Sequence, residues 1–122
     1  MGEAALEEVG RREARAETWR ALEDALATLD EAGDTNMNVV TYATPVGIRP
    51  ERRWALSLFK STVSRANFAR RRRGVLQLLR PEHAPLVYAL GGTSAADADK
   101  AAACYGAGFA WESSDWDERV LP

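Results

Sequence analysis

One stretch decides how this sequence is interpreted: Leu56-Ser57-Leu58-Phe59-Lys60-Ser61-Thr62-Val63-Ser64-Arg65-Ala66-Asn67-Phe68. Its first half predicts a strand and its second half a helix, with a lysine and several hydroxyls where the two meet. A helix start exposes unpaired backbone N–H groups and a partial positive charge, so this junction is a candidate anion site. The plainer alternative is that Thr62 or Ser64 caps the helix and Arg65 points into water.

The surrounding segments predict an α+β chain. Apolar residues at spacings of three and four indicate an amphipathic helix that ends near Gly33. β-Branched and aromatic runs indicate strands, and capping and turn residues indicate further helices. The predicted helices span residues 18–33, 82–90 and 94–105, and one more helix of about three turns begins near residue 64 and ends at 70–74. Ser94 and Asp97 are predicted to form a capping box at the start of the helix over 94–105. The predicted strands span residues 38–44, 54–59 and 75–79.

Length and composition limit the class of protein. A chain of 122 residues suits one small domain, and no apolar run approaches the ~20 residues needed to span a bilayer. The acidic start is unlike a secretory signal, and a single cysteine excludes an internal disulfide, so a cytoplasmic location is expected. Cys104 is predicted to be buried and inert. The sequence contains no Cys/His cluster of the kind that binds a metal ion.

Charge is distributed in three blocks. Residues 1–33 carry nine acids and four arginines, residues 49–80 carry ten bases and one acid, and residues 81–122 carry seven acids and two bases. A basic middle block predicts either an anion-binding surface or mutual attraction with the acidic flanks. The run Arg70–Arg73 is expected to pair with the acidic N-terminal helix. Nucleic-acid binding is not expected, because the run spans one turn and has no neighbouring aromatic residues.

Residues 38–111 resemble the flavin reductase-like, FMN-binding split-barrel family. The resemblance rests on the order and spacing of several pieces: Asn38–Gly47, Trp54–Lys60, Ser64–Phe68, Gly74–Leu79, Leu90-Gly91 and Ser94–Lys100. It implies a partial antiparallel split β-barrel in residues 36–122, with residues 1–35 as a helical extension. Relatives continue with further strands that close the barrel, so the resemblance also implies that this domain is incomplete.

The resemblance also implies a cofactor and a site. Family members bind FMN, sometimes FAD, usually as homodimers, and many use NAD(P)H to reduce the flavin. The phosphate and ribityl candidates are Lys60, Ser61, Thr62, Ser64 and Asn67, and the residues implied along the isoalloxazine are Thr41, Tyr42, Ala43 and Thr44. The cofactor would supply the redox chemistry, and the protein its placement. A non-catalytic flavin-binding or dimeric interaction module of the same fold is the alternative.

Overall fold

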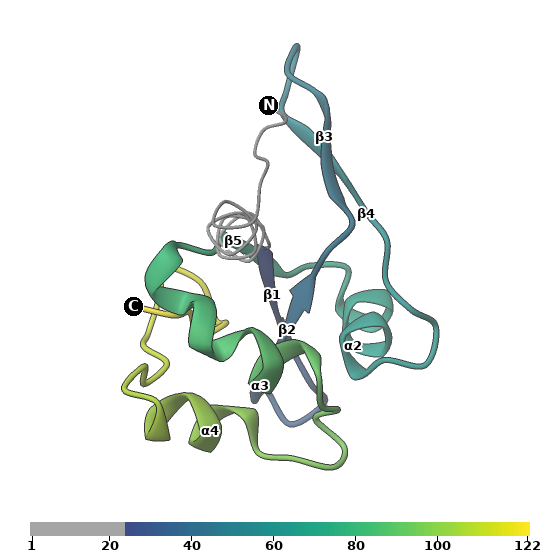
Figure 1. Ribbon diagram of the computed structural model, residues 1–122. Helices are drawn as coiled ribbons and strands as arrows, with labels where there is room; N and C mark the ends of the chain where they lie inside the picture. Colours follow the sequence, from purple (N-terminus) through teal and green to yellow (C-terminus); the bar gives the residue numbers. More distant parts are fainter. Residues whose placement is uncertain (1–23) are drawn as a thin grey trace.

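The computed structural model describes residues 24–122 as two antiparallel sheets with short helices (Figure 1). The larger sheet has the strand order β2-β1-β5, and β3 pairs with β4 in the smaller one. The α+β class with antiparallel pairing is therefore confirmed. The elements are β1 (Asp24–Leu29), β2 (Thr35–Val40), β3 (Ala43–Gly47), β4 (Arg53–Leu56), α2 (Val63–Arg71), β5 (Val75–Leu78), the 3-10 helix η1 (Pro81–Leu86), α3 (Val87–Gly91) and α4 (Lys100–Gly106).

β1 is the central strand of the larger sheet, so the predicted helix over 18–33 is wrong from Asp24 onward. Asp24 lies opposite Val40 of β2 on one side and opposite Leu78 of β5 on the other. All six residues of β1 are buried. A strand buried on both faces carries apolar or small residues at successive positions, and such a run cannot be distinguished from a helical stripe by periodicity. Residues 18–23 of that prediction lie outside the described part of the chain.

The predicted division into an extension, 1–35, and a domain, 36–122, crosses this sheet. β1 comes from the predicted extension, whereas β5 and nearly all of β2 come from the predicted domain. The extension therefore contributes the middle strand of the main sheet rather than a separate helix on its surface.

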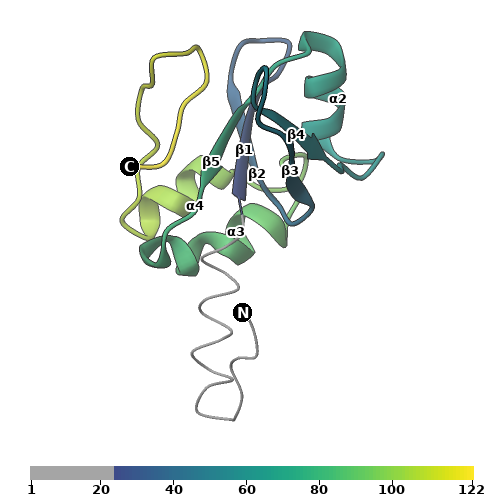
Figure 2. The same cartoon turned by 90° about the horizontal axis from the view of Figure 1, so that it is seen from above.

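Helices lie on both sides of the larger sheet (Figure 2). On one side, α2 is joined to β1 by a hydrogen bond of 3.2 Å from Asn67 Nδ2 to Thr28 Oγ1. On the other side, η1, α3 and α4 enclose the apolar core. That core consists of Ala25, Ala27, Met37, Leu79, Leu86, Leu90, Cys104, Trp111 and Leu121, so the prediction of a buried thiol is confirmed.

The predicted strand 38–44 is divided between two sheets. β2 ends at Val40, and the chain enters β3 at Ala43. β3 and β4 then form a hairpin that projects from the larger sheet (Figure 1). Within residues 24–122 the strands close no barrel, and no helix there is long and apolar enough to cross a membrane.

The helices after β5 differ from their predicted forms. The predicted helix 82–90 is η1 followed by α3, because Pro85 lacks an N–H group and cannot continue an α-helical ladder. The predicted start of the last helix at Ser94 is wrong. Ser94 Oγ accepts from Ala96 N in a turn (3.2 Å), whereas Asp99 caps α4 by accepting from Ala102 N (3.0 Å).

Candidate functional site

The predicted strand 54–59 ends earlier than expected, because β4 stops at Leu56 and a loop of residues 57–62 separates it from α2. The predicted helix start after this segment is confirmed. Thr62 is the N-cap of α2, and its Oγ1 accepts from Arg65 N at 3.2 Å. The same hydroxyl donates to Phe59 O at 2.9 Å, which folds the loop back on itself. The first turn of α2 contains no acidic residue, and Lys60 and Ser61 are exposed beside it. This helix start therefore presents a positive potential to solvent.

Two predicted site residues on α2, Ser64 and Asn67, point toward the sheet. Both are buried, and Ser64 Oγ accepts from Asn36 Nδ2 at 2.9 Å. Asn67 binds Thr28 through Nδ2 and accepts from Arg70 Nη2 at 3.0 Å. The hydrogen bonds of Asn67 therefore hold α2 against β1, while Ser64 lies at the edge of a polar cavity.

That cavity, which we call the polar niche, has a volume of about 30 Å³. It lies where β2, the start of α2 and the segment before α4 meet. Four of its lining residues, Asn36, Val63, Ala95 and Lys100, also line an open groove of about 560 Å³. The niche is thus a recess of the groove. Its lining residues are Asn36, Asn38, Thr62, Val63, Ser64, Thr93, Ser94, Ala95 and Lys100.

Lys100 is the buried cation of the polar niche. Its Nζ donates to Leu90 O at 2.8 Å and to Asn38 Oδ1 at 3.4 Å. Burial lowers the pKa of Lys100, because a charged ammonium loses hydration there. No carboxylate of residues 24–122 forms an ion pair with it. Asn36 Oδ1 is also buried and has no hydrogen-bond partner in the described structure.

The sequence interpretation did not identify Asn36, Asn38 or Lys100 as site residues. One signal was present: asparagine is uncommon in strands, and two asparagines at alternate positions of one strand share a face. Lys100 carried no comparable signal, because its burial involves contacts with Leu90 of α3 and Asn38 of β2.

The predicted isoalloxazine residues lie elsewhere. Thr41 lines a separate cavity of about 390 Å³ with Val39, Tyr88 and the Gly91-Gly92 pair. Tyr42, Ala43 and Thr44 follow it into β3, and Tyr42 O accepts from Ser57 N at 2.9 Å, which ties the start of the hairpin to its end. The structure therefore brings Thr62 and Ser64 together at the niche and places Thr41 in another cavity.

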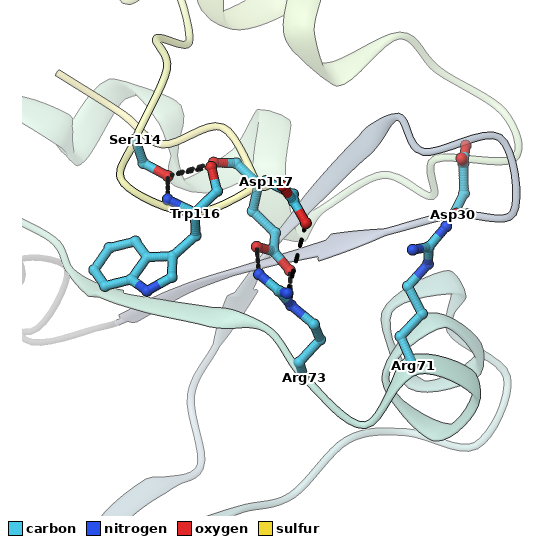
Figure 3. A network of polar contacts seen from close by, with 7 residues as sticks. Asp30, Arg71, Arg73, Ser114, Trp116 and Asp117 are labelled. Atoms are coloured by element: carbon cyan, nitrogen blue, oxygen red, sulfur yellow. Dashed lines mark hydrogen bonds and ion pairs between the residues drawn. The ribbon is translucent and has the colours of Figure 1, made fainter.

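The arginine run at the end of α2, Arg70–Arg73, contacts acidic segments of the fold (Figure 3). Arg73 binds the buried carboxylate of Glu118 through two hydrogen bonds of 2.8 and 3.1 Å, and Asp117 lies 3.6 Å from it. This pairing raises the pKa of Arg73. Arg70 lies 3.7 Å from Glu31, and Arg71 donates to Asp30 O. The partners described here are thus the β1–β2 turn and the C-terminal segment, not a helix.

The arrangement of these elements matches solved structures. A flavoredoxin of Desulfovibrio vulgaris (Miyazaki F) superposes with a TM-score of 0.68 at 16% identity over 99% of this chain and 58% of that one. An FMN-binding domain of a flavin reductase-like enzyme from Shewanella baltica OS155 superposes with a TM-score of 0.66 at 20% identity over 87% of this chain and 56% of that one. This chain shares the fold of these two proteins.

The chain spans little more than half the length of each of these two neighbours. No protein-family model and no curated protein matches the sequence. At this level of identity the likeness establishes the fold alone.

Proposed function

We propose that this chain binds FMN. Two observations support the proposal: the fold is shared with an FMN-binding domain, and α2 begins without an acidic residue beside an exposed lysine. A phosphate dianion accepts hydrogen bonds from helix N-terminal N–H groups and is attracted by the helix dipole. The helix start carries the proposal, because it supplies a phosphate site where the fold supports a flavin.

In this proposal the residues have distinct roles. Lys60, Ser61 and the first N–H groups of α2 hold the phosphate, and Thr62 fixes the helix start. Ser64 lies next to the ribityl chain, and Asn67 acts indirectly by holding α2 against β1. Thr41, Tyr42, Ala43 and Thr44 are proposed along the isoalloxazine ring. A bound flavin would supply the redox chemistry, and this chain would supply placement and phosphate recognition.

The test is titration of the full chain with FMN and with riboflavin, followed by flavin fluorescence. We expect FMN to bind more tightly, because riboflavin lacks the phosphate. Lys60→Ala should weaken FMN binding about five- to tenfold, the effect of one exposed charge contact worth ~1 kcal/mol, and should leave riboflavin binding unchanged. Arg52→Ala, which removes an exposed arginine from the distant hairpin loop, is the matched control. A chain that binds neither flavin contradicts the proposal.

We further propose NAD(P)H-dependent flavin reduction by a homodimer in the reducing cytoplasm. The β3–β4 hairpin supports a second copy, because Val46, Ile48 and Trp54 are 62%, 72% and 50% exposed. Edge strands with exposed apolar residues favour pairing with another chain. Light scattering across a concentration series tests for the dimer, and anaerobic bleaching of bound FMN by NADH or NADPH tests for the reaction. A flavin-loaded dimer that neither nucleotide bleaches would favour the non-catalytic alternative.

A further inference from the structure

We propose that His83 is a pH-sensitive latch for the C-terminal strap, which we define as Leu121-Pro122. The latch holds the strap while the imidazole is neutral and weakens its attachment when the imidazole is protonated. His83 is the single histidine of the sequence, lies in η1 and is 0% exposed. Histidine is the side chain whose charge ordinarily changes between about pH 5 and pH 8. The inference goes beyond the proposed function and does not depend on flavin binding.

The hydrogen bonds of His83 match the neutral ring. Arg80 N donates to His83 Nδ1 at 3.1 Å, so Nδ1 is the acceptor and carries no hydrogen. His83 Nε2 lies 2.9 Å from Pro122 O, which can only accept, so the hydrogen of the neutral ring is on Nε2. A protonated ring carries a hydrogen on both nitrogens. The hydrogen on Nδ1 would then face the N–H of Arg80, and the contact between them would break.

The same contact also forms the start of η1. His83 N donates to Arg80 O at 2.9 Å, while Arg80 N donates to His83 Nδ1. The two residues therefore form a capping box, in which the imidazole takes the place of the usual Glu or Gln side chain. Protonation of one ring thus affects both the first turn of η1 and the strap that the ring contacts.

The groups around the imidazole do not compensate a positive charge. Arg80 Nη2 donates to the same Pro122 O at 2.8 Å, which places a guanidinium beside the ring. Glu82 is exposed, and its Oε2 accepts from Arg80 Nε at 3.1 Å. The uncharged ring of Phe109 packs edge-to-face against the imidazole, with 5.5 Å between the centroids. No carboxylate of residues 24–122 forms an ion pair with His83. A buried imidazolium is therefore disfavoured in the latched state.

The strap is attached through side chains of β5 and η1. Gln77 donates through Nε2 to Leu121 O at 2.8 Å and accepts through Oε1 from Leu121 N at 2.9 Å. Pro122 O accepts from Arg80 and contacts His83, as described above. Leu121 is 2% exposed and belongs to the apolar core. Loss of the capping contact of His83 would loosen Pro122 and let Leu121 leave the core more often.

The test measures amide hydrogen exchange of Leu121 by NMR at several pH values between about pH 8 and pH 5. In the parent chain the protection factor of this amide should fall with pH by up to about tenfold per pH unit, the slope for one proton taken up on opening. His83→Gln is the matched control, because its side-chain amide can accept from Arg80 N and donate to Pro122 O but does not titrate. Its protection factor should stay constant over the same range.

The ¹⁵N shifts of the single imidazole provide a second measurement that needs no variant. At the upper end of the range they should show a neutral ring with its hydrogen on Nε2, and a hydrogen on Nδ1 or a charged ring there overturns the latch. Constant protection of Leu121 in the parent, or an equal fall in His83→Gln, also overturns it. A Gly-Ser extension after Pro122 controls for the charge of a terminal carboxylate, and constant protection in the extended chain is a further contradicting result. The measurements on the parent and extended chains decide the question if His83→Gln does not fold.

Discussion

Replacing Gly74 with alanine tests whether the central strand β1 is where the structure places it. An added Cβ at Gly74 would lie 3.0 Å from Ala27 O, 3.1 Å from Leu26 Cδ1 and 3.3 Å from Thr28 Cγ2. All three neighbours belong to β1, so the crowding exists only if β1 lies in the sheet. Overpacking of this kind costs ~1–3 kcal/mol. Alanine has less conformational freedom than glycine in the unfolded chain, so the substitution also stabilises the folded state by ~0.4–1 kcal/mol. The net result is a loss of stability.

Gly106→Ala is the matched control for this prediction. A Cβ at Gly106 would meet nothing within 4 Å, so the variant changes the unfolded chain in the same way without crowding the fold. Urea unfolding of both variants should show Gly106→Ala equal to or more stable than the parent. Gly74→Ala should be less stable than Gly106→Ala by ~1–3 kcal/mol, or at least ~4 °C in Tm. Equal stability of the two variants would refute the placement of β1 beside Gly74.

Three further predictions concern other parts of the fold. Burial raises the pKa of the Cys104 thiol above its ordinary value of 9.0, so above that pH the unfolded chain loses a proton that the folded chain keeps. The free energy of unfolding should therefore fall as pH rises through 9.0. Urea titrations at several pH values should show a smaller fall for Cys104→Ala. An equal fall in the parent and the variant would contradict the burial of this thiol. Glu118→Ala should lower Tm much more than Asp117→Ala, because the carboxylate of Glu118 is fully buried against Arg73 and that of Asp117 is exposed; equal shifts would show that the buried pair adds nothing. Thr62→Ala should cost ~1 kcal/mol in urea unfolding through loss of the helix cap, whereas Thr62→Ser should cost little; equal losses would point to the methyl group instead.

Segments with a strong local signal were predicted well from the sequence. The helix after Thr62 and the strand at Val75 form as predicted, because a capping hydroxyl and a β-branched apolar run favour those structures without help from distant residues. The placement of Thr62 at the helix start follows from the same local chemistry.

The failures have a common physical origin in long-range packing. Asp24–Leu29 carries alanine and leucine, which favour a helix locally, yet pairing with strands on both sides makes it a strand. The burial of Lys100 likewise involves a contact with Asn38, which lies 62 residues away in sequence. The polar niche could therefore not be predicted from one sequence, whereas the helix start beside it could.

The β3–β4 hairpin contributes no side chain to the buried apolar cluster of the described chain. Its opening would thus expose little core surface, and it is expected to form a separate cooperative unit with a lower opening free energy than β1. Its amide hydrogens should exchange with solvent faster than those of the central sheet. A flavin that contacts both Thr44 of the β3–β4 hairpin and Lys60 in the loop before α2 would link the hairpin to the rest of the fold. Slower amide hydrogen exchange in the hairpin after addition of FMN would then show that the flavin connects the hairpin to the central sheet.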